Sequence, residues 1–285
     1  MVQMHRTIRQ RLMVGLALGA ALLAGNGLRA QAQFAEAVIN YNPGNLPSWL
    51  LSYTNPSAAL GEPSRLTPGP FGGPVDPFNP PYLPEQLVAV GAGGWLTVQM
   101  AVPIVNLPGH PFGLDFLIFG NAGFVITNGD YTGGGITDGS LFGQLVGTST
   151  VWVSPDNLAW YRLDPALAPP LDGLYPTDGA GEFLLPVNPA LGSADFAGLG
   201  LPGIRALYAG SGGGAGFDLA WARDANGQPV SLDSARFVRV EVSGGHAEID
   251  AFVAVPEPSA LSLVGLAVAM ALGWAWPRSQ VRRKL

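Results

Sequence analysis

The sequence predicts an all-β domain, and three observations indicate this class. Glycine and proline are frequent, with 40 and 26 residues in a chain of 285, so we expect many turns and few long helices. Between the two ends of the chain no stretch keeps the 3.6-residue apolar period of an amphipathic helix, whereas several short runs have the apolar pattern of strands. The middle of the chain, residues 33–254, has a length that one all-β domain commonly reaches.

The first 32 residues have the features of a secretory signal peptide. A basic segment, residues 5–11, precedes an apolar stretch, residues 12–28. Ala30 and Ala32 then form a small-x-small cleavage site. We expect export through the Sec translocon and cleavage by signal peptidase after Ala32. The alternative is an N-terminal anchor that is not cleaved.

The C-terminal segment, residues 255–285, has an uncharged run at residues 260–276. This run is at the lower limit of what spans a bilayer as a transmembrane helix, and the basic residues after it favour a cytoplasmic C-terminus. These features alone are compatible with two alternatives, a single-pass membrane anchor or a buried C-terminal helix. The residues that flank the run are Pro256, Glu257 and Pro258 before it, and Arg282 and Arg283 after it.

The Val-Pro-Glu-Pro-Ser motif, the apolar run and the arginine-rich end resemble, in this order, the PEP-CTERM sorting signal of exported bacterial proteins. The resemblance implies recognition by an exosortase-type membrane protease and removal of the tail, as in other sorting tails that look like anchors. It further implies a transient stay in the inner membrane. Delivery to the cell surface or the exopolysaccharide matrix of a Gram-negative bacterium would follow.

The residues between the two ends are strongly acidic. All twenty acidic residues lie between Glu36 and Glu257, against six basic residues and no lysine, a net charge of −14. Such a surface repels nucleic acid and anionic lipid, so we expect no nucleic-acid partner. Cysteine is absent. Stability must therefore come from an apolar core, from bound metal, or from both.

The expected strands follow one another along the domain. After a first strand near residue 34, a run with eight prolines at residues 62–84 predicts an extended surface loop, which we expect to be flexible. Apolar and polar residues alternate over 95–102, as in a half-buried strand. The other expected strands are 114–119, 150–154 and 160–163 as a hairpin, and 235–242 and 247–253 joined through Gly244 and Gly245.

Two of these segments carry a second resemblance. The hairpin VWVSPDNLAWYRL and the later SARFVRVEV resemble the galactose-binding-like jelly roll. The matching positions are Ser154, Asp156, Asn157, Trp160 and residues 235–240. The resemblance implies a jelly-roll-like β-sandwich over about residues 90–254.

A glycine-rich loop at residues 128–139 is a candidate metal site. Asn128, Asp130 and Asp138 supply hard oxygen ligands beside glycines that allow tight curvature, as a structural calcium site requires. The spacing matches no EF-hand or RTX repeat. The alternative is a solvated glycine-rich turn.

A second polar group lies near the end of the domain. His246, Glu248 and Asp250 alternate along an expected strand and therefore share one face. Together they could hold a metal ion or a sugar. The alternative is the solvated face of an edge strand.

The sequence predicts a binding protein rather than an enzyme. There is no G-x-S-x-G, H-E-x-x-H, P-loop or cysteine nucleophile. Aromatic rings and polar groups in loops suit carbohydrate, so extracellular polysaccharide is the expected ligand of a non-catalytic carbohydrate- or matrix-binding module. The alternatives are a secreted enzyme acting on polysaccharide and a purely structural matrix protein. The candidate ligand-binding residues are Tyr131, Trp221, Arg223 and Asp224, with Trp49, Tyr175 and Asp130 as further loop residues of these types.

Overall fold

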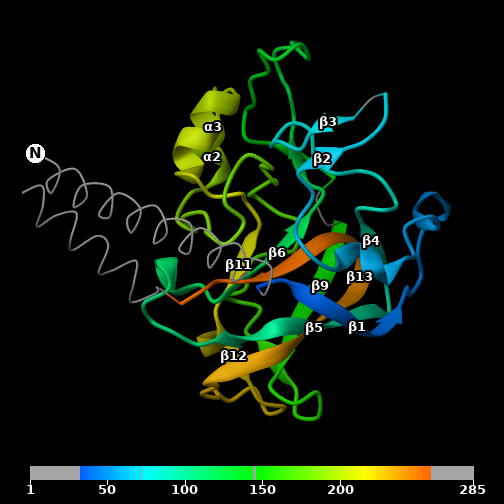
Figure 1. Ribbon diagram of the computed structural model, residues 1–285, viewed down its shortest axis with the longest axis vertical. Coiled ribbons are helices and arrows are strands. Elements are labelled where there is room, and N and C mark those ends of the chain that lie inside the picture. The colour runs from blue at the N-terminus through cyan, green and yellow to red at the C-terminus, as the bar shows by residue number, and fades with distance from the viewer. Residues whose placement is uncertain (1–32, 71, 144–145, 258–285) are drawn as a thin grey trace, which may run out of the picture.

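The computed structural model describes residues 33–70, 72–143 and 146–257. The domain is all-β, as predicted, with a nine-stranded sheet and two two-stranded ladders (Figure 1). The predicted signal peptide with Ala30 and Ala32, and the sorting tail from Pro258 onward with its helix at 260–276, lie outside the described residues. Within the described part, no helix has the length and apolar character needed to cross a membrane.

The regular elements are short apart from four strands of the large sheet. The strands are β1 (Ala35–Asn42), β2 (Leu66–Thr67), β3 (Gly73–Pro74), β4 (Val88–Gly91), β5 (Gly94–Val105), β6 (Phe116–Gly120), β7 (Gly123–Phe124), β8 (Leu141–Phe142), β9 (Val146–Ser154), β10 (Tyr161–Leu163), β11 (Ala215–Phe217), β12 (Ala222–Arg223) and β13 (Ser234–Ala254). The helices are α2 (Ser193–Phe196), α3 (Leu201–Tyr208) and the 3₁₀ turns η1 (Ser48–Leu50), η2 (Pro56–Ala59), η3 (Pro111–Gly113) and η4 (Leu219–Trp221).

The large sheet is built around β13. The first half of β13 pairs antiparallel with β5 on one side and β9 on the other, while its second half pairs with β4 and β6. β1 extends the sheet beyond β5, and β10 and β12 extend it beyond β9. The predicted hairpin of β9 and β10 is present, with Tyr161 opposite Val153.

The expectation of two separate strands joined through Gly244 and Gly245 is wrong, because β13 continues through both glycines. β9 stays paired across this point, with Gly147 opposite Gly245 and a register shift between Val242 and Gly244. A Cβ atom on Gly147 would lie 1.7 Å from the carbonyl oxygen of Gly244. The two backbones therefore approach more closely than side chains would allow, and the glycines bend the strand instead of reversing it.

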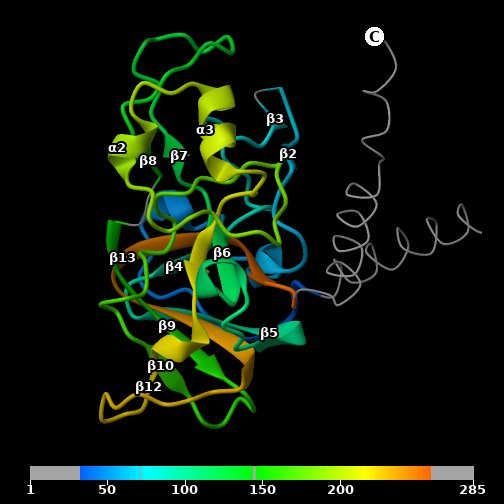
Figure 2. The same ribbon diagram turned by 90° about the vertical axis from the view of Figure 1, so that its left-hand side faces the viewer.

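The bend allows the two halves of β13 to enclose one core. Val238 and Val240 from the first half and Ile249 and Phe252 from the second half belong to the same buried cluster. Figure 2 shows the ribbon of β13 curving over this core. The sheet therefore covers the core from more than one side, as apolar strands require.

A second layer lies at one end of the sheet. α2, α3, β7 and β8 gather there (Figure 2), around a buried cluster that includes Phe124, Phe196, Ile204 and Tyr208. The short α3 begins at Leu201 with Pro202 in its first turn, where proline is tolerated. The space between this layer and β13 holds the site described next.

The proline-rich segment packs against the rest of the domain, and its expected flexibility stays a prediction. It forms the β2–β3 ladder, and Val75 is fully buried. Ser64 donates its backbone N–H to Asp250 Oδ2 at 2.8 Å and its hydroxyl to Asp250 Oδ1 at 2.9 Å. The Arg65 guanidinium lies 4.2 Å from the centre of the Phe183 ring. These contacts fix the segment that carries one wall of the site.

The two ends of the described domain lie side by side. The backbone N–H of Ala254 donates to the carbonyl oxygen of Gln33 at 2.7 Å, and Phe34 forms an antiparallel bridge with Val253. Val255 is buried, whereas Glu257 is exposed. The described part of the chain therefore begins and ends at one corner of the fold.

Candidate functional site: an aromatic cleft on β13

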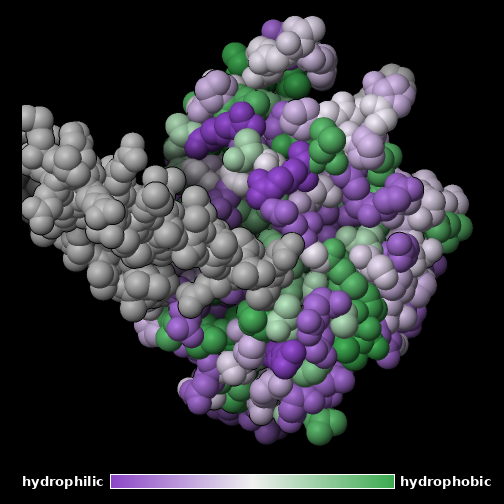
Figure 3. Space-filling view, viewed as in Figure 1, coloured by the Kyte–Doolittle hydropathy of each residue, from purple (hydrophilic) through white to green (hydrophobic). Residues whose placement is uncertain are grey.

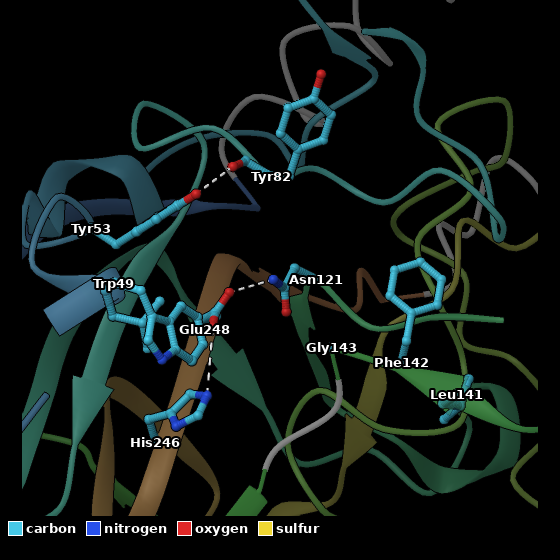
Figure 4. Close-up of a pocket in the computed structure, with 10 residues that line it drawn as sticks. Trp49, Tyr53, Tyr82, Asn121, Leu141, Phe142, Gly143, His246 and Glu248 are labelled. Atoms are coloured by element: carbon cyan, nitrogen blue, oxygen red, sulfur yellow. Dashed lines mark hydrogen bonds and ion pairs between the residues drawn. The ribbon is translucent and has the colours of Figure 1, made fainter. Parts of the chain in front are cut away.

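A cavity of about 460 Å³ opens between the second half of β13 and the second layer. We call it the aromatic cleft. Figure 4 shows Glu248 near its centre, with Asn121 and His246 beside it and aromatic rings around them. The aromatic lining residues are Trp49, Tyr53, Tyr82 and Phe142, and the polar ones are Asn121, His246 and Glu248.

The segment around η1 places the first wall of the cleft. Leu50 is fully buried, which anchors the turn and leaves the neighbouring Trp49 61% exposed over the cleft. The hydroxyl of Tyr53 donates to the carbonyl oxygen of Tyr82 at 2.6 Å. This bond joins the η1 segment to the proline-rich segment, so two distant parts of the chain hold their rings at one opening.

Glu248 is the buried acid of the cleft, with 6% of its surface exposed. Asn121 Nδ2 donates to Glu248 Oε2 in a short hydrogen bond. The other oxygen, Oε1, lies 3.7 Å from His246 Nε2, which is beyond hydrogen-bond range. Burial raises the pKa of Glu248 to about 7, against the opposing effect of the Asn121 hydrogen bond. Glu248 is therefore partly ionised at neutral pH.

His246 is neutral at pH 7. Burial lowers its pKa below the usual value near 6.5. Its ring meets the Trp49 ring edge-on, with 5.2 Å between centroids. The indole therefore also holds the imidazole against β13, next to Glu248.

A buried carboxylate behind the cleft positions Asn121. The backbone N–H of Ala122 donates to Asp172 Oδ1 at 2.5 Å. A Cβ atom on Gly120 would lie 2.3 Å from the same oxygen, so only glycine fits at this position. Burial raises the pKa of Asp172 well above its usual range, and the nearby Glu248 raises it further. Asp172 thus fixes the backbone from which Asn121 reaches Glu248.

The predicted polar row on β13 serves two purposes. His246 and Glu248 line the cleft, whereas Asp250 is 3% exposed and binds Ser64. The alternative of a solvated edge strand is wrong, because β13 has hydrogen-bonded neighbours on both sides. Burial raises the pKa of Asp250 to about 7, although both Ser64 hydrogen bonds oppose the shift.

The candidate calcium residues each cap a local turn. Asn128 Oδ1 accepts from the backbone N–H of Ile136 at 3.1 Å. Asp130 Oδ1 accepts from the Thr132 hydroxyl, and Asp138 Oδ1 accepts from the Ser140 hydroxyl. Within the described residues no group of three or more His, Asp or Glu side chains is placed to hold a metal ion. Calcium stays a prediction: if it binds only the folded domain, a chelator must lower the midpoint of thermal unfolding.

The predicted ligand-binding residues do not come together. Tyr131, which is 76% exposed, lies on the glycine-rich loop at one end of the molecule, and β12 lies at the other (Figures 1 and 2). Trp221 packs partly against the core. Arg223 pairs with Asp164 at 3.0 Å, and Asp224 Oδ1 accepts from the backbone N–H of Asn226 at 2.8 Å.

Of the sequence candidates, the cleft contains His246, Glu248 and Trp49. Sequence reasoning missed Tyr53, Asn121 and Phe142, which come from separate segments. One signal for Asn121 was available, since it directly follows the continuously apolar β6. The face shown in Figure 3 carries both polar and apolar areas.

No family model matches the chain, and no curated protein matches it. The geometry of the cleft and the sequence signals at the two ends are therefore the basis for its function.

Proposed function

We propose that this protein is exported, is sorted by its PEP-CTERM tail, and acts at the cell surface or in the exopolysaccharide matrix as a non-catalytic carbohydrate-binding module. The Sec translocon, signal peptidase and an exosortase-type protease would process it. We further propose that the domain is a jelly-roll-like β-sandwich of the galactose-binding-like type. A core enclosed by both halves of β13 supports this finer assignment.

The aromatic cleft is the observation that carries the binding proposal. Sugars present apolar C–H faces, which pack on aromatic rings, and hydroxyl groups, which need hydrogen-bonding partners. Trp49 and Phe142 offer exposed rings at the opening, and Glu248 and Asn121 offer polar groups inside. A concave site with apolar walls and a few polar groups is what small-ligand binding requires.

A binding role is favoured over hydrolysis by the carboxylates of the cleft. Most glycosidases use two Asp or Glu residues that flank the scissile bond. Among the described lining residues only Glu248 is acidic. Asp172 is buried beside Ala122 and does not line the cleft.

Binding of the full-length protein to polysaccharides, measured by affinity electrophoresis, tests the proposal. We expect Trp49→Ala to weaken binding at least about tenfold, because it removes an exposed stacking surface. Tyr131→Ala is the matched control, since Tyr131 is also an exposed aromatic residue but does not line the cleft. Equal affinity of both variants would remove the cleft as the binding site.

The competing functions give other results. Release of reducing sugar that Glu248→Gln abolishes would show an enzyme. Absence of binding to every polysaccharide would support a purely structural matrix protein. For the sorting route, mass spectrometry of the mature protein should find no Trp276 or Arg282. Their presence would indicate a retained membrane anchor instead.

A further inference from the structure

The unpaired oxygen of Glu248 distinguishes the cleft from a general sugar site. Oε2 is occupied by Asn121, but within the described residues Oε1 accepts no hydrogen bond, and its ion-pair contact with His246 is long, at 3.7 Å. The side chain lines the cleft although it is more than nine-tenths buried. A buried carboxylate with an open acceptor is unfavourable unless a donor or a positive charge reaches it.

The protein itself supplies no such charge. Among the described lining residues there is no Lys or Arg. His246 is uncharged at neutral pH because burial lowers its pKa. The hydroxyl of Tyr53 is already donated to Tyr82. Oε1 is therefore open to a donor that a ligand brings into the cleft.

We propose that the aromatic cleft binds the primary ammonium group of an amino sugar, as found in a de-N-acetylated polysaccharide. This inference rests on the proposed carbohydrate-binding function and names the class of sugar. An ammonium group carries three N–H donors and a positive charge, which match the single open carboxylate oxygen. Trp49 and Phe142 line the same cleft, and aromatic ring faces attract cations.

The charge around the cleft excludes the opposite class of sugar. A uronic acid would bring a second carboxylate to Glu248, with no cation in the lining to offset the repulsion. A neutral N-acetylated sugar keeps the ring contacts but loses the ion pair. We expect the order of affinity to be amino sugar, then N-acetylated sugar, then uronic acid.

The ion pair requires an ionised Glu248 and a protonated amine. The titratable groups around Glu248 are His246 and Asp250 on β13, Asp172 behind Asn121, and Tyr53. The pKa of Tyr53 is raised by its burial and by the nearby charges of Glu248 and Glu85. Below about pH 7 Glu248 gains its proton, and at alkaline pH the amine loses its own. Affinity for the amino sugar should therefore be highest near neutral pH.

The test is calorimetric titration of the full-length protein with three trisaccharides: fully de-N-acetylated chitotriose, tri-N-acetylchitotriose and trigalacturonic acid. At pH 7 we expect the de-N-acetylated form to bind about tenfold more tightly than the N-acetylated form. Glu248→Gln keeps the acceptor for Asn121 and should abolish this difference. The wild-type protein gives a second readout that needs no variant: at pH 5 the preference should be lost.

Each outcome decides the inference. Equal binding of the two chitotrioses, or a preference that Glu248→Gln leaves unchanged, would overturn the proposed amino-sugar specificity. The proposal of a carbohydrate-binding cleft would stand. Absence of binding to all three overturns both proposals. Tetramethylammonium, added as a competitor, distinguishes the source of the charge. Tighter binding of this ion than of de-N-acetylated chitotriose would assign the cleft to quaternary ammonium groups and overturn the amino sugar.

Discussion

Ser64 holds the buried carboxylate of Asp250 with two hydrogen bonds, of 2.8 and 2.9 Å, across 186 residues of chain. This contact joins the proline-rich segment to the central strand of the sheet. It also places a titratable carboxyl group where the solvent hardly reaches it. The cleft depends on it indirectly, because Tyr82 lies on the same proline-rich segment.

The burial of Asp250 should make stability depend on pH. Its pKa is raised from 3.8 to about 7, so the folded protein keeps a proton that the unfolded chain releases between these values. This contribution to stability is complete below pH 4 and is lost as the pH rises through 7. Between pH 5 and pH 8, the free energy of unfolding of the wild type should therefore fall by about 2–3 kcal/mol relative to that of Asp250→Asn.

Urea denaturation of both proteins at pH 5 and pH 8 measures this difference. The Glu248 contribution has the same sign but is common to both proteins, so it cancels. Asp233→Asn, at an exposed position, is the control and should show no such dependence. A difference between wild type and Asp250→Asn that is the same at both pH values would contradict the prediction.

Gly120→Ala should destabilise the fold and weaken the cleft together. The new Cβ atom would lie 2.3 Å from Asp172 Oδ1 and 2.5 Å from Asp172 Cγ. Overpacking of this kind costs about 1–3 kcal/mol. The same shift would move Asn121 away from Glu248. Gly109→Ala is the matched control, because nothing lies within 4 Å of its Cβ position.

Thermal melts and trisaccharide titration of these two glycine variants check the prediction. We expect the control to stay within about 0.5 kcal/mol of wild type, as surface substitutions do. Loss of affinity in Gly120→Ala without loss of stability would mean that Asp172 adjusts to the methyl group. Wild-type behaviour in both assays would show that Asp172 does not fix Asn121.

Arg205→Ala should lower stability by about 2 kcal/mol. Arg205 on α3 donates to both oxygens of Asp178, at 2.7 and 2.8 Å, and the Asp178 side chain is 2% exposed. Its removal leaves a buried carboxylate without its cation. Arg236→Ala is the control, since its pair with Glu36 is longer, at 3.3 Å, and exposed, and it should cost less than about 0.5 kcal/mol. Equal melting temperatures of the two variants would contradict this prediction.

The sequence was informative where one segment decides the structure by itself. Alternation over residues 95–102 predicted β5, and turn residues at 155–157 predicted the pairing of β9 with β10. The glycine pair at 244 and 245 is compatible with a hairpin as well as with a bend. The bend depends on Gly147, which lies opposite Gly245 although it is about a hundred residues earlier in the chain. The sequence around residues 244 and 245 does not contain that information.

The same limit applies to the cleft. The spacing of His246, Glu248 and Asp250 correctly placed polar side chains on β13, but their burial depends on β4, β6 and the proline-rich segment. Tyr131 and Trp221 have the right chemistry for sugar, yet the fold carries them to opposite ends of the domain. Composition identifies suitable residue types, whereas assembly of Trp49, Asn121 and Phe142 requires the tertiary structure.

The contact between Gln33 and Ala254 has a mechanical consequence. Because these two segments run antiparallel and end at the same corner, a force that pulls them apart would act directly on the contacts between them. The load would fall first on the Gln33–Ala254 bond and the Phe34–Val253 bridge. A domain held at this corner alone would feel no such tension, and the shape of its cleft would not depend on the load.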